Sequence, residues 1–350
     1  MSEPQRRWQG RRAAGTAGPA DHGEPGEPRP DRDRDLPDRQ ERAVPGQPGG
    51  DERLSAGPVT ATGLGVCDCH DHVFFRSAQL PGQELDDKHA AIAELRSFRD
   101  LGGQTVVQWT PYGLGRRAEW LAEVSEASGV QVIGATGLHQ RAHYADQALI
   151  DDLLPKLAAL FTEELTLGMR PDNPAADRGP RAGLIKVAGA FHHLDDHARR
   201  TMTAAAEAHH ATGAPIGVHH ELGTAAPDVA ALLIGELKVS PDKVILGHLN
   251  RQPDPHVHLQ LAQTGAFLAF DGPSRANHAT DWRLYECLGN LASHGHADRI
   301  LIGGDTTTAT ARGAPGMPFL LRSVRPRIAA ELGADIARKF FEHNPARAFS

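Results

Sequence analysis

From about residue 58 onward, short apolar runs alternate with longer amphipathic stretches. Short apolar runs bounded by polar or glycine-containing segments are typical of buried strands, and the longer stretches between them have helical patterns. The predicted strands are 65–69, 105–109, 131–135, 183–187, 215–219, 244–248, 266–270 and 299–303. The predicted helices are 87–101, 118–128, 145–167, 195–212, 224–237, 255–263, 281–294 and a final region from residue 318.

Strands that alternate regularly with helices predict an α/β fold, and eight such pairs predict a (β/α)8 TIM barrel over residues 58–350. A doubly wound open sheet is the competing architecture. No Gly-x-Gly-x-x-Gly follows the first strand, which removes the commonest reason to prefer that alternative. In a barrel, the catalytic residues come from the carboxyl ends of the strands.

Residues 1–57 differ from the rest of the chain. They combine proline, glycine and alternating charge with almost no large apolar residues, as in 24–30 and 31–35. Such a segment cannot bury enough surface to offset the entropy of ordering, so we expect a disordered N-terminal extension. Its paired arginines are not followed by the apolar region of an export signal. A start codon assigned too far upstream is an equally simple explanation of this segment.

Composition excludes several classes of protein. The 350 residues are 40% hydrophobic and 23% charged, which suits one large domain or two small ones. A net charge of -7 argues against nucleic acid as a partner. No apolar stretch approaches the roughly 20 residues of a membrane-spanning helix. Three cysteines form no disulfide framework, so we expect a cytoplasmic protein.

The first predicted strand leads into a His-x-His pair, His70 and His72. Side chains alternate along an extended chain, so both histidines are expected on one face, together with Asp68. Two imidazoles in that arrangement can bind one metal ion, although ordinary polar side chains at a strand end would look the same.

The cysteines of this strand, Cys67 and Cys69, are expected on the opposite face, packed outward against the helices. A structural zinc site is the alternative for them. Only Cys287 remains to complete such a site, which leaves it short of four ligands.

Lys186 lies inside the apolar run 183–187, where an uncompensated ammonium group would be costly. A lysine at a sheet edge, with its ammonium reaching solvent, is the ordinary explanation. Burial that lowers the pKa offers a second one, because a neutral amine can react with carbon dioxide to form a carbamate. The two oxygens of that group can bridge two cations.

Three further strands end in polar residues that suit a metal site, namely His219, His248 and Asp305. A histidine that ends one apolar strand is more often a core residue than a ligand, but successive strands ending this way favour ligands. His220 has the opposite parity to His219 and is not a candidate. An aspartate there often caps a helix or forms a turn. Beside a metal-activated hydroxide, Asp305 can coordinate and accept a proton, so it is the catalytic candidate.

This order of residues resembles the phosphotriesterase family of the amidohydrolase superfamily, and the resemblance covers residues 62–349. The segments 110–116 and 344–347 agree with it. The resemblance implies two divalent metal ions, zinc first and manganese or cobalt as alternatives. It implies that the more buried ion is bound by His70, His72 and Asp305, that the more exposed ion is bound by His219 and His248, and that a hydroxide and Lys186 as N6-carboxylysine bridge them.

The residue at position 74 argues against one related class of enzyme. Relatives of the dihydroorotase type have an arginine two residues after the second histidine, where this chain has Phe74. Relatives of the deaminase type lack the bridging lysine. The resemblance therefore implies a hydrolase that opens a lactone or carboxylic ester, or alternatively cleaves a phosphotriester. A barrel that binds metal or ligand without turnover is a third possibility, and a homodimer is consistent with the family.

Substrate contacts must come from the loops, and four residues are candidates. Trp109 and Tyr112, after the second strand, can form an apolar wall, although ordinary packing explains them equally well. His139 stands after the third strand, where family members often have an aromatic pair; a solvated loop histidine is its simpler interpretation. Arg275, after the seventh strand, can meet an anionic group such as the phosphate of a sugar lactone, or form a surface salt bridge.

Overall fold

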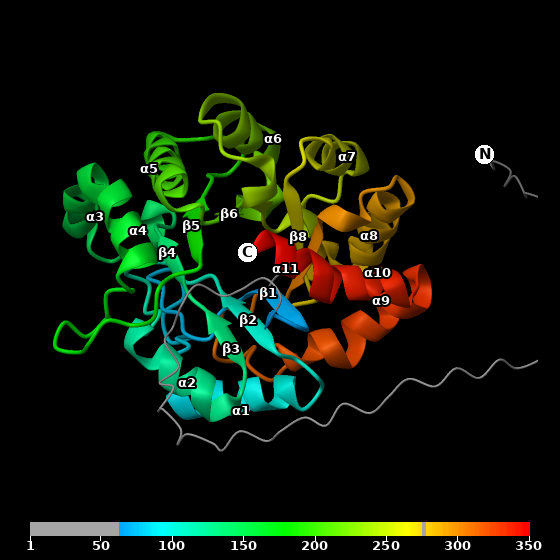
Figure 1. Ribbon diagram of the computed structural model, residues 1–350, viewed down its shortest axis with the longest axis horizontal. Helices are drawn as coiled ribbons and strands as arrows, with labels where there is room; N and C mark the ends of the chain where they lie inside the picture. The colour runs from blue at the N-terminus through cyan, green and yellow to red at the C-terminus, as the bar shows by residue number, and fades with distance from the viewer. Residues whose placement is uncertain (1–62, 275–277) are drawn as a thin grey trace, which may run out of the picture. The chain divides into compact units, whose positions relative to one another are not determined.

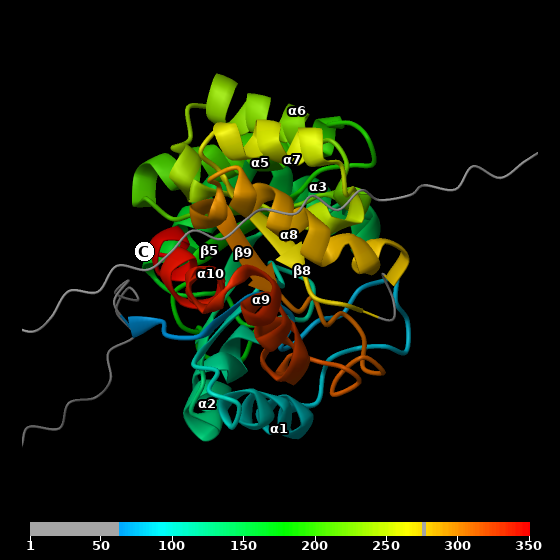
Figure 2. The same cartoon turned by 90° about the vertical axis from the view of Figure 1, so that its right-hand side faces the viewer.

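The computed structural model describes residues 63–274 and 278–350, all within one compact unit that spans Leu54–Ser350. The proposed extension, residues 1–57, and its boundary lie outside the described residues. Parallel strands form the centre of this unit and helices surround them (Figures 1 and 2). The α/β class and the (β/α)8 barrel predicted from the sequence are confirmed.

Within the described residues, nine strands occupy eight positions around the barrel, because one predicted strand is divided in two by Gly134. The strands are β1 (Cys67–Asp71), β2 (Thr105–Gln108), β3 (Gln131–Ile133), β4 (Ala135–Gly137), β5 (Leu184–Ala188), β6 (Ile216–His219), β7 (Val244–Leu246), β8 (Phe267–Asp271) and β9 (Ile300–Gly303). The carbonyl of Gly134 accepts a hydrogen bond from Gly183 N–H at 2.9 Å. The carbonyl of His70 accepts from Gly304 and Asp305 at 2.8 and 2.9 Å, which joins β1 to the segment that follows β9.

The helices lie between the strands in sequence and around them in space. They are α1 (Lys88–Arg99), α2 (Leu121–Ser128), α3 (Gln147–Leu153), α4 (Leu157–Thr166), α5 (Asp196–Thr212), α6 (Ala226–Ala230), α7 (Pro255–Gln263), α8 (Leu284–Ser293), α9 (Arg325–Leu332), α10 (Ala334–Arg338) and α11 (Asn344–Ala348). The predicted helix 145–167 is divided into α3 and α4, because Pro155 has no N–H with which to continue the helical hydrogen bonds.

Aspartates mark the start of four helices. The carboxylates of Asp87, Asp146, Asp195 and Asp254 accept backbone N–H groups in the first turns of α1, α3, α5 and α7. Such caps satisfy N–H groups that have no partner within the helix. They therefore fix where each loop at the barrel mouth ends.

The barrel interior is filled by a cluster of apolar side chains that is separate from the larger layer between strands and helices. Its members are Leu64, Cys67, Cys69, Val107, Trp109, Ile133, Ala135, Leu184, Ile245, Phe267, Ala269, Leu301, Ala348 and Phe349. Trp109 is the largest of them, and glycines make room for it. A Cβ at Gly217 would lie 2.9 Å from its indole, and one at Gly247 would lie 3.3 Å away.

The expected orientation of the first strand is wrong for Cys67 and Cys69. Both cysteines belong to the interior cluster and do not face the helices. The reason is a bulge: Asp68 pairs with Val106, whereas Asp71 pairs with Gln108, so three steps along β1 match two along β2. The alternation of side chains is reset between Cys69 and the first histidine.

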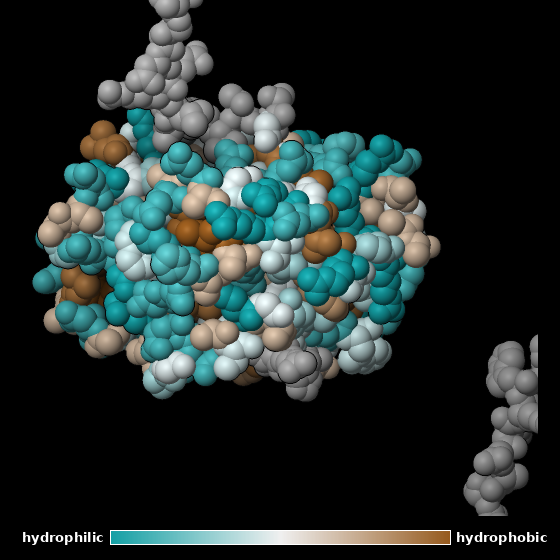
Figure 3. Space-filling model, turned by 90° about the horizontal axis from the view of Figure 1, so that it is seen from below, coloured by the Kyte–Doolittle hydropathy of each residue, from teal (hydrophilic) through white to brown (hydrophobic). Residues whose placement is uncertain are grey.

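Few large apolar side chains are exposed in the part of the chain that the structure describes. They are Leu101, Leu149, Leu167, Phe191, Leu222 and Trp282. On the face drawn in Figure 3, hydrophobic residues form separate small groups among hydrophilic ones. Within residues 63–274 and 278–350, every helix is too short or too polar to cross a membrane.

Candidate metal centre

Of the six residues predicted to form a metal site, five lie at the carboxyl ends of strands and one, Lys186, lies in the middle of its strand. They are His70 and His72 on or just after β1, Lys186 in β5, His219 at the end of β6, His248 after β7 and Asp305 after β9. All are buried except His219, whose side chain keeps 16% of its surface exposed. The structure therefore places all six side chains at one end of the barrel.

Three short distances bring the candidate ligands together in two groups. The Nε2 atoms of His70 and His72 each lie 3.6 Å from Oδ1 of Asp305. His248 Nε2 lies 2.8 Å from His219 Nδ1. The assignment of these residues to two metal ions stays a prediction.

The backbone takes an uncommon conformation at two of these residues. His248 has φ +59° and Asp305 has φ +53°, in the left-handed region that non-glycine residues rarely adopt. At His248 this conformation also explains why β7 ends at Leu246, earlier than predicted. Local strain of this kind is held in place by the surrounding structure and is concentrated at functional sites.

Each of the four imidazoles has one ring nitrogen turned toward the centre and the other bound by a partner. His70 Nδ1 contacts Asp271 at 3.0 Å, and His248 Nδ1 contacts the other oxygen of the same carboxylate at 2.6 Å. His219 Nε2 lies 3.2 Å from Glu221 Oε2. Carboxylate partners of this kind fix the tautomer and leave the opposite nitrogen as a metal ligand.

The fourth imidazole is oriented by a hydroxyl. Thr110 Oγ1 lies 2.7 Å from His72 Nδ1 and donates its own hydrogen to the carbonyl of Phe74 at 2.6 Å. Because that hydrogen is already used, the hydroxyl accepts from Nδ1–H, and His72 Nε2 is free to bind a cation.

The donor atoms fit divalent metal ions. In the pair formed by His219 and His248, both inner nitrogens are acceptors, and acceptors 2.8 Å apart repel each other unless a cation lies close to both. Nitrogen and oxygen ligands of one tetrahedral zinc ion lie about 3.4 Å apart. The 3.6 Å separations around Asp305 Oδ1 are close to this value.

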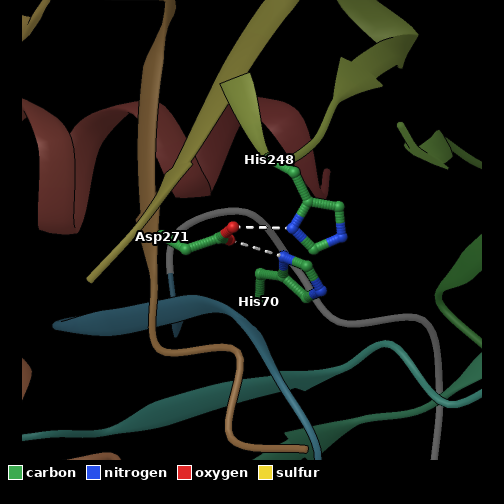
Figure 4. Close-up of side chains that lie close together, drawn as sticks. All are labelled: His70, His248 and Asp271. Atoms are coloured by element: carbon green, nitrogen blue, oxygen red, sulfur yellow. Dashed lines mark hydrogen bonds and ion pairs between the residues drawn. The ribbon is translucent and has the colours of Figure 1, made fainter. Parts of the chain in front are cut away.

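Asp271, which sequence reasoning did not select, supports both groups of ligands. It is the last residue of β8, and its carboxylate lies against His70 and His248, as Figure 4 shows. These three residues could themselves hold an ion. The Nε2 atoms face the other ligands, however, so Asp271 fits better as their outer partner. Its position as a carboxylate ending an apolar strand was the available signal.

Arg251 is a second residue that the sequence did not reveal. It follows His248 by three positions, and its guanidinium pairs with Asp305 and lies 3.4 Å from Asp271. Burial by itself would raise the pKa of Asp305. The Arg251 guanidinium and the neighbouring imidazoles outweigh burial and hold the pKa of that carboxyl well below its ordinary value.

Lys186 lies on the face of β5 that Leu184 also turns toward the interior. Burial lowers the pKa of its ammonium group to about 7. A substantial fraction of the side chain is therefore a neutral amine at neutral pH, which is the form that can react with carbon dioxide.

The four candidate substrate contacts have different surroundings. Trp109 is fully buried beneath the centre; its ring centroid is 4.0 Å from that of His70, and its Nε1 donates to Cys69 O. Tyr112 is half-buried and packs on the Arg116 guanidinium. Arg275 lies outside the described residues.

His139, the fourth candidate, also lies beside a candidate ligand. It is buried, and its ring packs edge-on against His219 at 4.6 Å between centroids. Its Nδ1 has no hydrogen-bond partner among the residues that the structure describes. Burial is the main reason that the pKa of His139 is well below its ordinary value, and the Lys186 charge adds to this effect. The imidazole is therefore neutral and can donate or accept one hydrogen bond.

Imidazoles and a carboxylate gathered at the carboxyl ends of barrel strands form a site that can bind catalytic metal ions, as an enzyme of the barrel class requires. The sequence of residues 53–349 matches the phosphotriesterase family. The chain belongs to this family and is an ester-hydrolysing enzyme.

Individual proteins similar to this chain are also hydrolases. The chain is 31% identical to a phospho-furanose lactonase of Mycoplasmopsis synoviae over 72% of this chain and 75% of that protein. The lactonase Lmo2620 from Listeria monocytogenes superposes with a TM-score of 0.75 at 28% identity, covering 83% of this chain and 96% of that structure. An organophosphorus hydrolase from Deinococcus radiodurans superposes with a TM-score of 0.71 at 27% identity, covering 83% and 94%.

Proposed function

We propose that this protein is a two-metal hydrolase that opens a lactone or a related carboxylic ester. The observation that carries the proposal is that all four imidazoles are oriented in the same way. Each directs one nitrogen toward the centre, where Asp305 and Lys186 also lie, and each is held from behind by a partner. Such complete outer support is characteristic of metal ligands.

The proposed ligands follow from these orientations. Nε2 of His70 and His72 with Oδ1 of Asp305 would hold the more buried ion. Nδ1 of His219 and Nε2 of His248 would hold the more exposed one. Lys186, as a carbamate, would bind both ions. Zinc suits this set of nitrogen and oxygen donors, and manganese or cobalt are alternatives.

The charges around the centre support two divalent ions. The carboxylates of Asp271, Asp305 and Glu221 outnumber the Arg251 guanidinium by two negative charges. Two divalent cations, a carbamate on Lys186 and a hydroxide would bring the sum of these charges to zero. Cations held at this place would stabilise the negative charge that develops on a substrate oxygen during ester hydrolysis.

When bound, the ions supply an activated water nucleophile and polarise the substrate oxygen. The protein side chains provide the rest. Asp305 accepts the proton that the nucleophile loses, and Arg251 orients its carboxylate. His139, neutral and unpartnered at its Nδ1 within the described structure, is proposed to hydrogen-bond the substrate beside His219. Trp109 and Tyr112 are proposed to shape the site through packing.

The relatives favour a lactone as the substrate, because two of them are named lactonases and one of these acts on a phospho-furanose. A phosphorylated sugar lactone would require a cation at the barrel mouth, and Arg275 is our candidate. Phosphotriester hydrolysis is the alternative that the organophosphorus hydrolase supports. A cytoplasmic location fits the three buried cysteines with free thiols.

Metal analysis and a substrate panel test this proposal. Zinc- and manganese-loaded protein would be assayed with γ-lactones, their 5-phosphorylated forms and a dialkyl aryl phosphate. We expect two metal ions per chain and a higher kcat/KM for lactones. A preference for the phosphotriester would select the alternative, and two bound metals without turnover of any ester would indicate a binding protein.

A further inference from the structure

Glu221 is the outer partner of only one candidate ligand, His219, and it comes two residues later in the chain. Gln140 Nε2 donates to the same carboxylate oxygen at 3.1 Å and also to the carbonyl of Gly189 at 2.7 Å. The carboxylate is therefore held between the imidazole of His219, at the end of β6, and the amide of Gln140, in the segment after β4.

The turn that carries Glu221 is fixed tightly against the loop after His248. Leu222 has φ +49° and Gly223 has φ +75°. A Cβ at Gly223 would lie 2.8 Å from the carbonyl oxygen of His248 and 2.7 Å from the backbone nitrogen of Gln252. Only glycine fits this approach, and the turn thereby sets the direction of the Glu221 side chain.

Solvent exposure distinguishes Glu221 from the other outer partners. The Asp271 side chain is 2% exposed and Thr110 is fully buried, whereas the Glu221 side chain is 36% exposed. The imidazole that Glu221 holds is also the most exposed of the four. Glu221 is therefore in contact with solvent, whereas the other hydrogen-bond partners of the candidate ligands, Asp271 and Thr110, are buried.

We propose that Glu221 is a positioning residue that keeps His219 in the orientation in which Nδ1 binds metal, and that it controls the retention of the more exposed ion alone. This inference rests on the proposed two-metal function. The buried ion has no ligand that contacts Glu221, so its retention depends on Asp271 and Thr110. Loss of an outer partner lowers metal affinity by about 10–100-fold.

The test measures zinc content and zinc release rather than activity alone. Wild type, Glu221→Ala and Glu221→Gln would be loaded with zinc, dialysed, and then exposed to a chromogenic chelator in excess. We expect wild type to release two ions in two phases, and Glu221→Ala to release one of them about 10–100-fold faster while the other phase is unchanged. In Glu221→Gln, the amide oxygen can still accept from Nε2–H, so the effect should be intermediate.

Two controls separate this role from a general loss of structure. Glu163→Ala removes a carboxylate that is ion-paired with Arg170 and Arg178 at α4, and its release should match wild type. Thr110→Val removes the hydrogen-bond partner of His72, a proposed ligand of the more buried ion. It should accelerate the release phase of that ion, which Glu221→Ala leaves unchanged.

The possible outcomes are distinct. If wild type holds two ions and hydrolyses a lactone, but Glu221→Ala releases both at wild-type rates, this inference is wrong and the proposed function stands. Acceleration of both phases in Glu221→Ala would equally overturn it. Fewer than two ions in wild type would overturn the two-metal proposal together with this one.

Discussion

Replacing Asp271 by asparagine should weaken the binding of both metal ions. The carboxylate accepts hydrogen bonds from His70 Nδ1 at 3.0 Å and from His248 Nδ1 at 2.6 Å, and these residues belong to different groups of ligands. Asparagine has only one acceptor oxygen, and its NH2 group would face the second Nδ1–H. One imidazole must then rotate or change tautomer, which removes its Nε2 lone pair from the centre.

The expected loss follows from the number of ligands affected. Removing an outer partner costs about 10–100-fold in metal affinity, which corresponds to about 1.4–2.8 kcal/mol. Because Asp271 supports one ligand of each ion, both dissociation constants should rise, in contrast to the single effect expected for Glu221→Ala. Arg251 would lose one of its two carboxylate neighbours but keep the ion pair with Asp305.

Competition titration with a fluorescent zinc chelator would give the two dissociation constants, and thermal unfolding of the metal-free proteins would report on folding. Asp298→Asn is the matched control, since it removes an exposed carboxylate paired with Lys339. Wild-type affinity for both ions in a folded Asp271→Asn protein would refute the reasoning. A change at only one ion would show that the carboxylate does not join the two groups.

Three further predictions concern other residues. The pKa of Lys186 is lowered to about 7, and only the neutral amine reacts with carbon dioxide. Metal-depleted protein should therefore be reconstituted faster at pH 8 than at pH 6, at a fixed concentration of dissolved CO2. A rate that does not change with pH would contradict this. Asp305→Asn should retain much of the metal but lower kcat by at least about 100-fold, measured with the preferred lactone, and unchanged turnover would exclude Asp305 as the proton acceptor. Gly217→Ala places a Cβ 2.9 Å from the Trp109 indole and should destabilise the protein by about 1–3 kcal/mol in urea unfolding. Gly235→Ala, with open space around the new methyl group, is its control and should not show this loss.

The candidate ligands could be predicted because their position depends on topology alone. In a parallel barrel, the carboxyl end of every strand reaches the same mouth, so His219 and His248 could be placed together without knowing any contact. Thr110 lay within the segment that supported the family resemblance, but its role required the distance to His72. Asp271 satisfied the same positional rule as Asp305 and was missed because no metal-ligand role was expected for it.

Other features could not be predicted because they depend on contacts between strands. The bulge in β1 arises from hydrogen bonding to β2, and a strict alternation of side chains therefore placed Cys67 and Cys69 on the wrong face. Gly217 gave no signal by itself, since the space it leaves is filled by an indole from another strand. Glu221 was not selected, because its contact with His219 depends on a left-handed turn.

The indole beneath His70 gives this protein an internal optical reporter. Trp109 is fully buried, and its ring centroid lies 4.0 Å from that of a candidate ligand. Its fluorescence should therefore have a short-wavelength emission maximum and change in intensity when an ion binds to that imidazole. Of the four tryptophans in the sequence, Trp120 and Trp282 retain exposed surface, so selective replacement of the others would isolate this signal. Filling of the buried site could then be followed in real time, without a substrate and without any added label.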